Sequence, residues 1–263
     1  MDQAPGSDRV HRRRRRAAVA GHRGDVSSAR ELAEDSDVGV RSAALGALAR
    51  LGQWDAARLG RALADPEPTL RRRACELTGR VAQRYSETGQ TEDAWTMAAA
   101  MLTALDDDPP VAEAAAWALG ELGAWSSLAG SSSPAPGDCT SPPGRTSRSS
   151  PDGTSSTTGT APVPPGVSSR RALVVSRLIS AAEVHPDLLV RESAVAALGS
   201  IGDPAGLPAV LRALEGKPAL RRRAAVALAA FDDPRVDNAL RECLADRDWQ
   251  VREVAEELLG PRP

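Results

Sequence analysis

Few residues of this sequence could act directly in catalysis or bind a metal. It contains three histidines, His11, His22 and His185, and three cysteines, at positions 75, 139 and 243. Neither set has the paired spacing of a zinc site or of a disulfide framework. No nucleophile–base motif, phosphate-binding loop or paired-histidine motif occurs. The sequence therefore predicts no cofactor and no metal site, and the cysteines are expected to be reduced thiols.

Arginines and acids recur with regular spacing around a repeated apolar segment. The segment is clearest at Val190–Gly202 and Val40–Gly52, and looser copies begin at Leu70, Leu220 and Val251. An arginine lies one position after most of these starts, and an acid lies five positions before most of them. A carboxylate at that place can accept hydrogen bonds from the free N–H groups of a helix start, and the arginine can pair with an acid of its own or the adjacent unit. We expect a structural ladder of the following residues: Asp35, Arg41, Asp65, Arg71, Arg191, Glu215, Arg221, Asp246 and Arg252.

The spacing of the copies predicts a repeat architecture. The starts at 40 and 70 are 30 residues apart, and those at 190, 220 and 251 are 30 and 31 apart. A fixed period of this length is typical of a solenoid. Each unit is expected to contain a helix A, a turn and a helix B, with the apolar residues of helix B directed to the core. Those residues are Leu59, Leu63, Leu207, Leu211, Val236 and Leu240.

The repeats divide the chain into four segments. Residues 1–9 are a polar tail, and residues 10–125 hold the N-terminal repeats. Residues 126–169 are dominated by Ser, Thr, Pro and Gly and have no hydrophobic periodicity, which predicts a disordered insert. Residues 170–263 hold the C-terminal repeats, which are expected to continue the same solenoid.

The repeated pattern resembles HEAT repeats of the short, PBS-lyase-like type, whose motif is close to D-x4-[VL]-R-x2-A-x3-L-G. Asp35–Ala49 matches this motif except at the final glycine, and His185–Gly199 lacks only the leading acid. The resemblance implies an all-α, right-handed α-solenoid of about seven two-helix HEAT-like repeats. It further implies that helix A lies on the convex side and that helix B lines the concave side.

The resemblance also raises two enzymatic alternatives. Some HEAT-like proteins are hydroxylases that bind two iron ions through repeated His-Glu pairs, and others are bilin lyases. None of the three histidines here is followed by a glutamate, which excludes that di-iron site. An accessory lyase-type enzyme remains a weaker alternative, and no particular residue supports it.

Two groups of arginines are candidates for binding a partner. The open side of the B helices is expected to present Arg58, Arg61, Arg177, Arg212 and Arg241. This predicts a non-catalytic scaffold or adaptor that binds another protein through an acidic segment. The alternative is a binder of nucleic acid or another polyanion through the N-terminal run Arg12, Arg13, Arg14, Arg15 and Arg16.

Bulk properties bear on the compartment. The formal net charge is −2, so the whole chain is not attracted to nucleic acid or to anionic membranes. No apolar run approaches the about 18 residues of a membrane span. The apolar stretch after the arginine run, Ala17–Ala20, is too short for a signal-peptide core. The sequence therefore predicts a cytoplasmic protein with no membrane contact.

Overall fold

The computed structural model describes residues 5–88, 91–124 and 167–260, and every regular element in these ranges is helical. The α-helices are α1 (Pro5–Arg23), α2 (Val26–Leu32), α3 (Val38–Arg50), α4 (Ala56–Leu63), α5 (Pro68–Thr88), α6 (Thr91–Ala104), α7 (Pro109–Ala124), α8 (Val167–Val184), α9 (Leu188–Ile201), α10 (Leu207–Ala213), α11 (Pro218–Ala227), α12 (Pro234–Cys243) and α13 (Trp249–Leu259). Short 3-10 turns, η2 (Pro204–Gly206) and η3 (Leu228–Ala230), precede α10 and follow α11.

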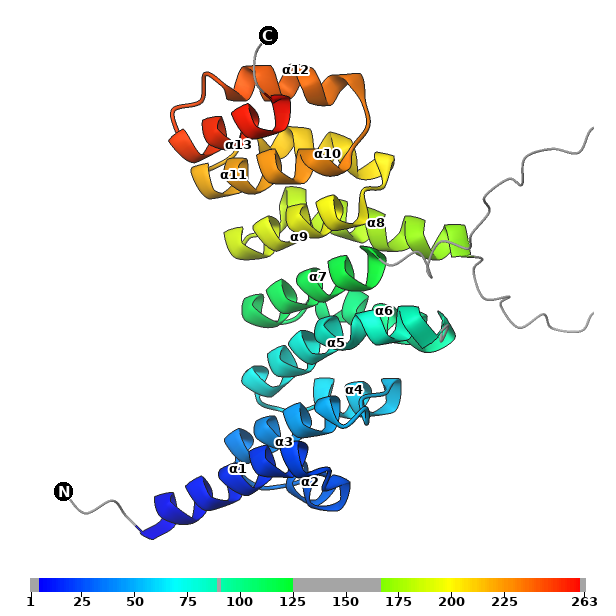
Figure 1. The fold of residues 1–263 in the computed structure, drawn as a ribbon, viewed down its shortest axis with the longest axis vertical. Coiled ribbons are helices and arrows are strands. Elements are labelled where there is room, and N and C mark those ends of the chain that lie inside the picture. Colours follow the sequence, from blue (N-terminus) through cyan, green and yellow to red (C-terminus); the bar gives the residue numbers. More distant parts are fainter. Residues whose placement is uncertain (1–4, 89–90, 125–166, 261–263) are drawn as a thin grey trace, which may run out of the picture.

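The helices stack as a two-layered solenoid (Figure 1). The odd-numbered helices are the A helices of successive units and pack on one another, from α1 at one end to α13 at the other. The even-numbered helices are the B helices and form the second layer. The expected all-α solenoid is thus confirmed. Of the expected disordered insert, residues 126–169, positions 126–166 lie outside the described residues.

Two helix boundaries differ from the expected segments. Helix α1 begins at Pro5, inside the expected polar tail, because proline suits the first turn of a helix and Asp8 pairs with Arg12 one turn later at 2.9 Å. Helix α8 begins at Val167, three residues before the expected restart of the repeats. Its first turns are held by Arg170, whose guanidinium binds Glu92 of α6 at 2.7 Å and lies 5.2 Å from the ring centroid of Trp95.

Short-range signals in the sequence set the ends of the helices. Aspartates at the N-caps accept hydrogen bonds from backbone N–H groups, as Asp37 does from Val40 at 3.0 Å and Asp55 from Arg58 at 2.7 Å. At the A–B turn after α9, Gly202 has a φ of 62°, a conformation that glycine adopts without strain, and it ends the helix. These caps keep the turns short and the period nearly constant.

The A helices approach one another through small residues. A Cβ atom placed on Gly120 of α7 would lie 2.8 Å from Cα of Ala197 in α9, and one on Gly199 would lie 2.9 Å from Cα of Ala227 in α11. Gly21 of α1 meets α3 in the same way. The B helices fill the other side of the core with larger side chains: Leu59, Leu207, Val236 and Leu240 are buried, and Leu63 and Leu211 are partly buried against them. This close packing holds the start of each A helix near the turn that begins the next unit.

Candidate binding surfaces

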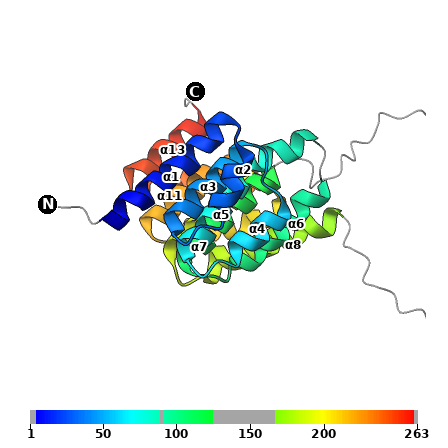
Figure 2. The same ribbon diagram turned by 90° about the horizontal axis from the view of Figure 1, so that it is seen from below.

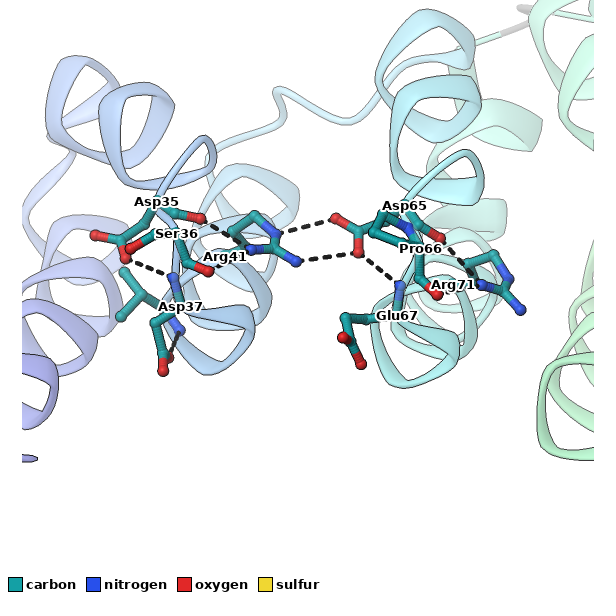
Figure 3. A network of polar contacts seen from close by, with 9 residues as sticks. Asp35, Ser36, Asp37, Arg41, Asp65, Pro66, Glu67 and Arg71 are labelled. Atoms are coloured by element: carbon teal, nitrogen blue, oxygen red, sulfur yellow. Dashed lines mark hydrogen bonds and ion pairs between the residues drawn. The ribbon is translucent and has the colours of Figure 1, made fainter.

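One rung of the ladder shows how the repeated arginine works (Figure 3). Arg41, at the start of α3, donates from Nε and Nη2 to the two carboxylate oxygens of Asp65, both at 3.0 Å. Its Nη1 donates to the backbone carbonyls of Asp35 at 2.9 Å and Ser36 at 3.0 Å. Asp65 also accepts from the N–H of Glu67 at 2.9 Å, which shapes the turn before α5. One guanidinium therefore joins the turns on both sides of its own unit.

The next rung has the same geometry with its acid shifted by one residue. Arg71 donates to both oxygens of Asp107, at 2.7 and 2.8 Å, and to Asp108 at 2.9 Å. Its Nη1 donates to the carbonyls of Asp65 and Pro66, both at 3.0 Å. The longer unit between α5 and α7 places Asp107 opposite the arginine.

Rungs also form near both ends of the stack. Arg221 binds Asp246 through two hydrogen bonds of 2.9 Å and donates to the carbonyl of Gly216 at 3.0 Å. At the N-terminal end the partner of Asp35 is Arg13, which binds it at 2.7 and 3.1 Å. Arg13 was expected among the residues for a polyanion, and it forms the first rung of the ladder instead.

The rung between α7 and α9 is absent, and both of its positions are changed. The arginine position holds Ala112, and the acid position opposite it holds His185. The ring Nδ1 of His185 accepts from the N–H of Asp187 at 3.1 Å, so it replaces the aspartate in shaping the turn. Arg191, in the next unit, donates from Nε to the carbonyl of Ala182 at 2.9 Å and pairs with no carboxylate in the part of the chain that the structure describes.

The remaining predicted ladder residues form no ion pair with another described residue. Glu215 is exposed and makes no side-chain bond to another described residue. Arg252 donates to the carbonyls of Asp246 at 2.7 Å and Arg247 at 3.3 Å. The carboxylate rungs thus join the A helices from α1 to α7 and join α11 to α13, whereas the junctions from α7 to α11 are held by packing and by hydrogen bonds to backbone carbonyls.

The arginines lower the pKa of the carboxyl groups that they bind. Hydrogen bonds from Arg13, Arg71 and Arg221 hold the pKa values of Asp35, Asp107 and Asp246 below the usual aspartate value of 3.8. Folding therefore favours the ionised form of these groups, which contributes stability above the unfolded-state pKa. That contribution is lost as the pH falls from the unfolded-state pKa through the lower folded-state values.

We expect the free energy of unfolding to decline below about pH 4 through these groups. Asp246→Asn should unfold more readily at neutral pH and should show a shallower decline in acid, because one titrating group is gone. Urea unfolding followed by circular dichroism over a pH series measures both effects. A decline of equal steepness in the parent and in Asp246→Asn would contradict this origin of the acid sensitivity.

Most of the B-helix arginines expected on the open side are neutralised inside the chain. Arg241 binds Asn238 at 3.0 Å within α12, and Arg177 and Arg212 pair with acids of neighbouring turns or B helices. The acid partners are Asp106 for Arg177, at 2.7 Å, Glu183 for Arg212, and Asp237 for Arg241, at 3.6 Å. A continuous row of free positive charge along this side is therefore not present.

An arginine cluster on α2 and α4 differs from the rest of the B-helix side. It consists of Arg30, Arg58 and Arg61, and none of the three has a carboxylate within salt-bridge distance among the described residues. Gln53 joins two of them: its side chain accepts from Arg30 at 2.6 Å, and its carbonyl accepts from Arg58 at 2.9 Å. Burial and the charge of Arg61 lower the pKa of Arg58. Arg58 and Arg61 line a small cleft of about 80 Å³ beside the Arg41–Asp65 rung.

The N-terminal arginine run is divided among several partners. Arg12 binds Asp8 at 2.9 Å, and Arg16 binds Glu31 at 3.0 Å. With Arg13 in the ladder, Arg14 and Arg15 are left without a hydrogen bond or ion pair to another described residue. Arg12, Arg15 and Arg16 line an open cleft of about 370 Å³ between α1 and the start of α2.

Reactive and metal-binding groups are sparse in the described ranges. Cys75 and Cys243 are buried and free, and burial raises the pKa of Cys75 to about 12, so its thiolate is scarce at neutral pH. No group of three or more His, Cys, Asp or Glu side chains among residues 5–88, 91–124 and 167–260 is placed to hold a metal ion. Likewise, none of the described helices is long and apolar enough to cross a membrane.

Comparison with known proteins identifies the repeat type. The sequence profile for HEAT repeats matches residues 175–260. No curated protein matches this sequence significantly. Among solved structures, two engineered proteins are similar. The first has 15% sequence identity and a TM-score of 0.54, and the match covers 89% of this chain and 95% of that protein. The second has 16% sequence identity and a TM-score of 0.55, and the match covers 89% of this chain and 97% of that protein. The Escherichia coli protein YibA is similar at 14% identity and a TM-score of 0.51, covering 97% of this chain and 74% of YibA. Residues 175–260 therefore match HEAT repeats, and the described helices together form a HEAT-like α-solenoid.

Proposed function

We propose that this solenoid is a non-catalytic scaffold that binds an acidic segment of a partner protein on its B-helix side. The observation that carries the proposal is the arginine cluster of Arg30, Arg58 and Arg61. Three like charges near one another repel, and although Asp55 and Glu34 offset part of that repulsion at Arg58, none of the three arginines has an ion pair with a carboxylate among the described residues. A partner carboxylate would relieve that repulsion and accept the guanidinium N–H groups that the fold leaves free.

The surroundings of the cluster favour a peptide over a uniform polyanion. Glu34 and Asp65 line the same cleft as Arg58 and Arg61, so a ligand of uniform negative charge would also meet repulsion. Leu45, Ala62 and Leu70 also line the cleft but are almost fully buried, so its exposed lining is mainly of mixed charge. A segment with one or two acidic side chains among uncharged ones fits this lining. On this proposal the partner is a protein, and the N-terminal arginine run is not its main contact.

The experiment measures binding of a fluorescent peptide that combines glutamate and leucine residues, against the same peptide with glutamine in place of glutamate. Arg58→Glu with Arg61→Glu should weaken binding of the acidic peptide by about tenfold or more, because two attractive charges become repulsive. The matched control is Arg177→Glu with Arg212→Glu, which changes the same number of arginines on the same side at positions already paired. Reversal of Arg12 and Arg14 serves as a second control for the polyanion alternative.

The measurements distinguish a loss of binding from a loss of folding, and the arginine cluster from the N-terminal arginine run. Circular dichroism and thermal melting should stay close to the parent for the cluster variant, since Arg61 is exposed and Arg58 half-buried. Equal affinity for the acidic and glutamine peptides would overturn the proposal. Loss of binding on N-terminal reversal, with no effect of the cluster reversal, would transfer the binding role to the arginine run.

A further inference from the structure

The outer face of α1 is strongly basic. The helix contains seven arginines and one carboxylate, Asp8. The face toward α3 carries Ala17 and Gly21, which are packed against the stack. Helical spacing places Asp8, which pairs with Arg12 at 2.9 Å, and four further residues on the opposite face, away from α3. We call these four the α1 arginine face: Arg12, Arg15, Val19 and Arg23, which all line the open cleft beside α2.

The outer face of α13 has the opposite charge. Val251 and Ala255 are buried against the stack, and helical spacing directs the other side of the helix away from it. We call that side the α13 glutamate face: Trp249, Glu253, Glu256 and Glu257, all of them exposed. The single arginine of α13, Arg252, donates hydrogen bonds to the carbonyls of Asp246 and Arg247 in the preceding turn. Trp249 is 60% exposed, which leaves a large aromatic surface beside the glutamates.

The two faces lie at opposite ends of the stack (Figure 1). Seen along the stack, α1 and α13 project onto the same part of the outline (Figure 2). A second copy placed end to end could therefore bring its α1 arginine face over the α13 glutamate face of the first copy with little sideways displacement. Both faces belong to A helices, so the contact would continue the packing of A helix on A helix that builds each copy.

We propose that copies of this chain associate head to tail, the α1 arginine face of one copy binding the α13 glutamate face of the next. The charges of the two faces are complementary, and each face offers an apolar side chain: Val19 lies between the arginines of α1, and Trp249 lies at the N-terminal end of the α13 glutamate face. Because the two surfaces differ, the contact is heterologous, and each added copy leaves one face of each kind free. The association is expected to weaken with salt, since the charges are exposed and are screened over about 10 Å at 0.1 M ionic strength. The proposal uses none of the residues of the arginine cluster and does not depend on the proposed function.

Sedimentation velocity of the full chain over a range of concentrations, at low and high salt, tests this proposal. At low salt the weight-average mass should rise with concentration from 27.5 kDa to beyond twice that value, and high salt should return it to the monomer. Reversal of the basic face (Arg12→Glu, Arg15→Glu, Arg23→Glu) or of the acidic face (Glu253→Arg, Glu256→Arg, Glu257→Arg) should each give a monomer. Arg58→Glu with Arg61→Glu is the matched control and should associate like the parent.

Mixing the two reversed proteins is the decisive step. One then has two basic ends and the other two acidic ends, so neither binds itself, but an equimolar mixture should associate again. Circular dichroism verifies that each variant is folded. If the acidic-face variant is not folded, it is replaced by the neutral variant Glu253→Gln, Glu256→Gln, Glu257→Gln. A parent protein that stays monomeric at every concentration, or a mixture of folded variants that stays monomeric, overturns the proposal. The proposal is also overturned if reversal of the α1 arginine face abolishes association and reversal of the α13 glutamate face does not. In that case the α1 arginine face binds a different anion, such as nucleic acid.

Discussion

Arg41→Ala is expected to lower the free energy of unfolding by about 2–4 kcal/mol, because it leaves a largely buried carboxylate without its counter-ion. The side chains of Arg41 and Asp65 are only 15% and 13% exposed. The substitution also removes the donor for two backbone carbonyls in the turn before α3. Chemical denaturation followed by circular dichroism measures the change directly.

Two other arginines are controls for the Arg41 measurement. Arg191→Ala removes a hydrogen bond to a carbonyl but no ion pair, so its expected cost is about 1 kcal/mol. Arg223→Ala removes the same charge from an exposed position and should change stability by less than about 0.5 kcal/mol. If Arg41→Ala costs no more than Arg223→Ala, the rungs are not a source of stability.

The second large effect concerns the contact between α7 and α9. Gly120→Ala should destabilise the chain by about 2–3 kcal/mol, because an added methyl group in a close-packed core forces the surrounding backbone to move. The new Cβ atom would lie 2.8 Å from Cα and 2.9 Å from Cβ of Ala197. Neither is the end of a flexible side chain, so the two helices themselves must separate. Thermal melting should record this as a lower transition temperature.

Gly60→Ala is the opposite case within the same fold. Gly60 lies in α4, and a Cβ atom there would meet nothing within 4 Å. Alanine should stabilise the chain by about 0.5–1 kcal/mol, since it restricts the unfolded state and favours helix. The pair of variants separates close approach from helix propensity. A similar change in stability for both would mean that the α7–α9 contact can relax around a methyl group.

The fold was predictable from the sequence because its signals are local and repeated. A period near 30 residues, an apolar pattern and caps such as Asp37 and Gly202 each specify the same helical hairpin. The ladder was predictable at Arg41, Arg71 and Arg221 for the same reason. It was missed at Arg13 because that residue lies within the arginine run that was assigned to a polyanion, and its place opposite Asp35 is known only once α1 has been positioned.

The binding surfaces were harder to predict from the sequence than the fold. Whether Arg177 or Arg212 is free depends on an acid from a neighbouring unit, 71 or 29 residues away, and on side-chain rotamers that no spacing rule specifies. Arg30 was not among the candidates, because its place beside Arg58 arises from the packing of α2 against the next A–B turn. A charged residue on one B helix is thus interpretable only once the adjacent unit has been placed.

The missing rung between α7 and α9 also bears on how such an array changes by substitution. An arginine at 112 opposite His185, or an aspartate at 185 opposite Ala112, would place one half-buried charge there with no counter-ion, which is costly. The sequence contains neither half of the pair, and His185 keeps the turn with its ring nitrogen. A repeat that is copied or recombined into another register must therefore exchange both positions together, although they are 73 residues apart in the chain. At this boundary the pair is the unit that can be exchanged without loss of stability, whereas Arg191 is a ladder arginine that a backbone carbonyl satisfies in place of a carboxylate.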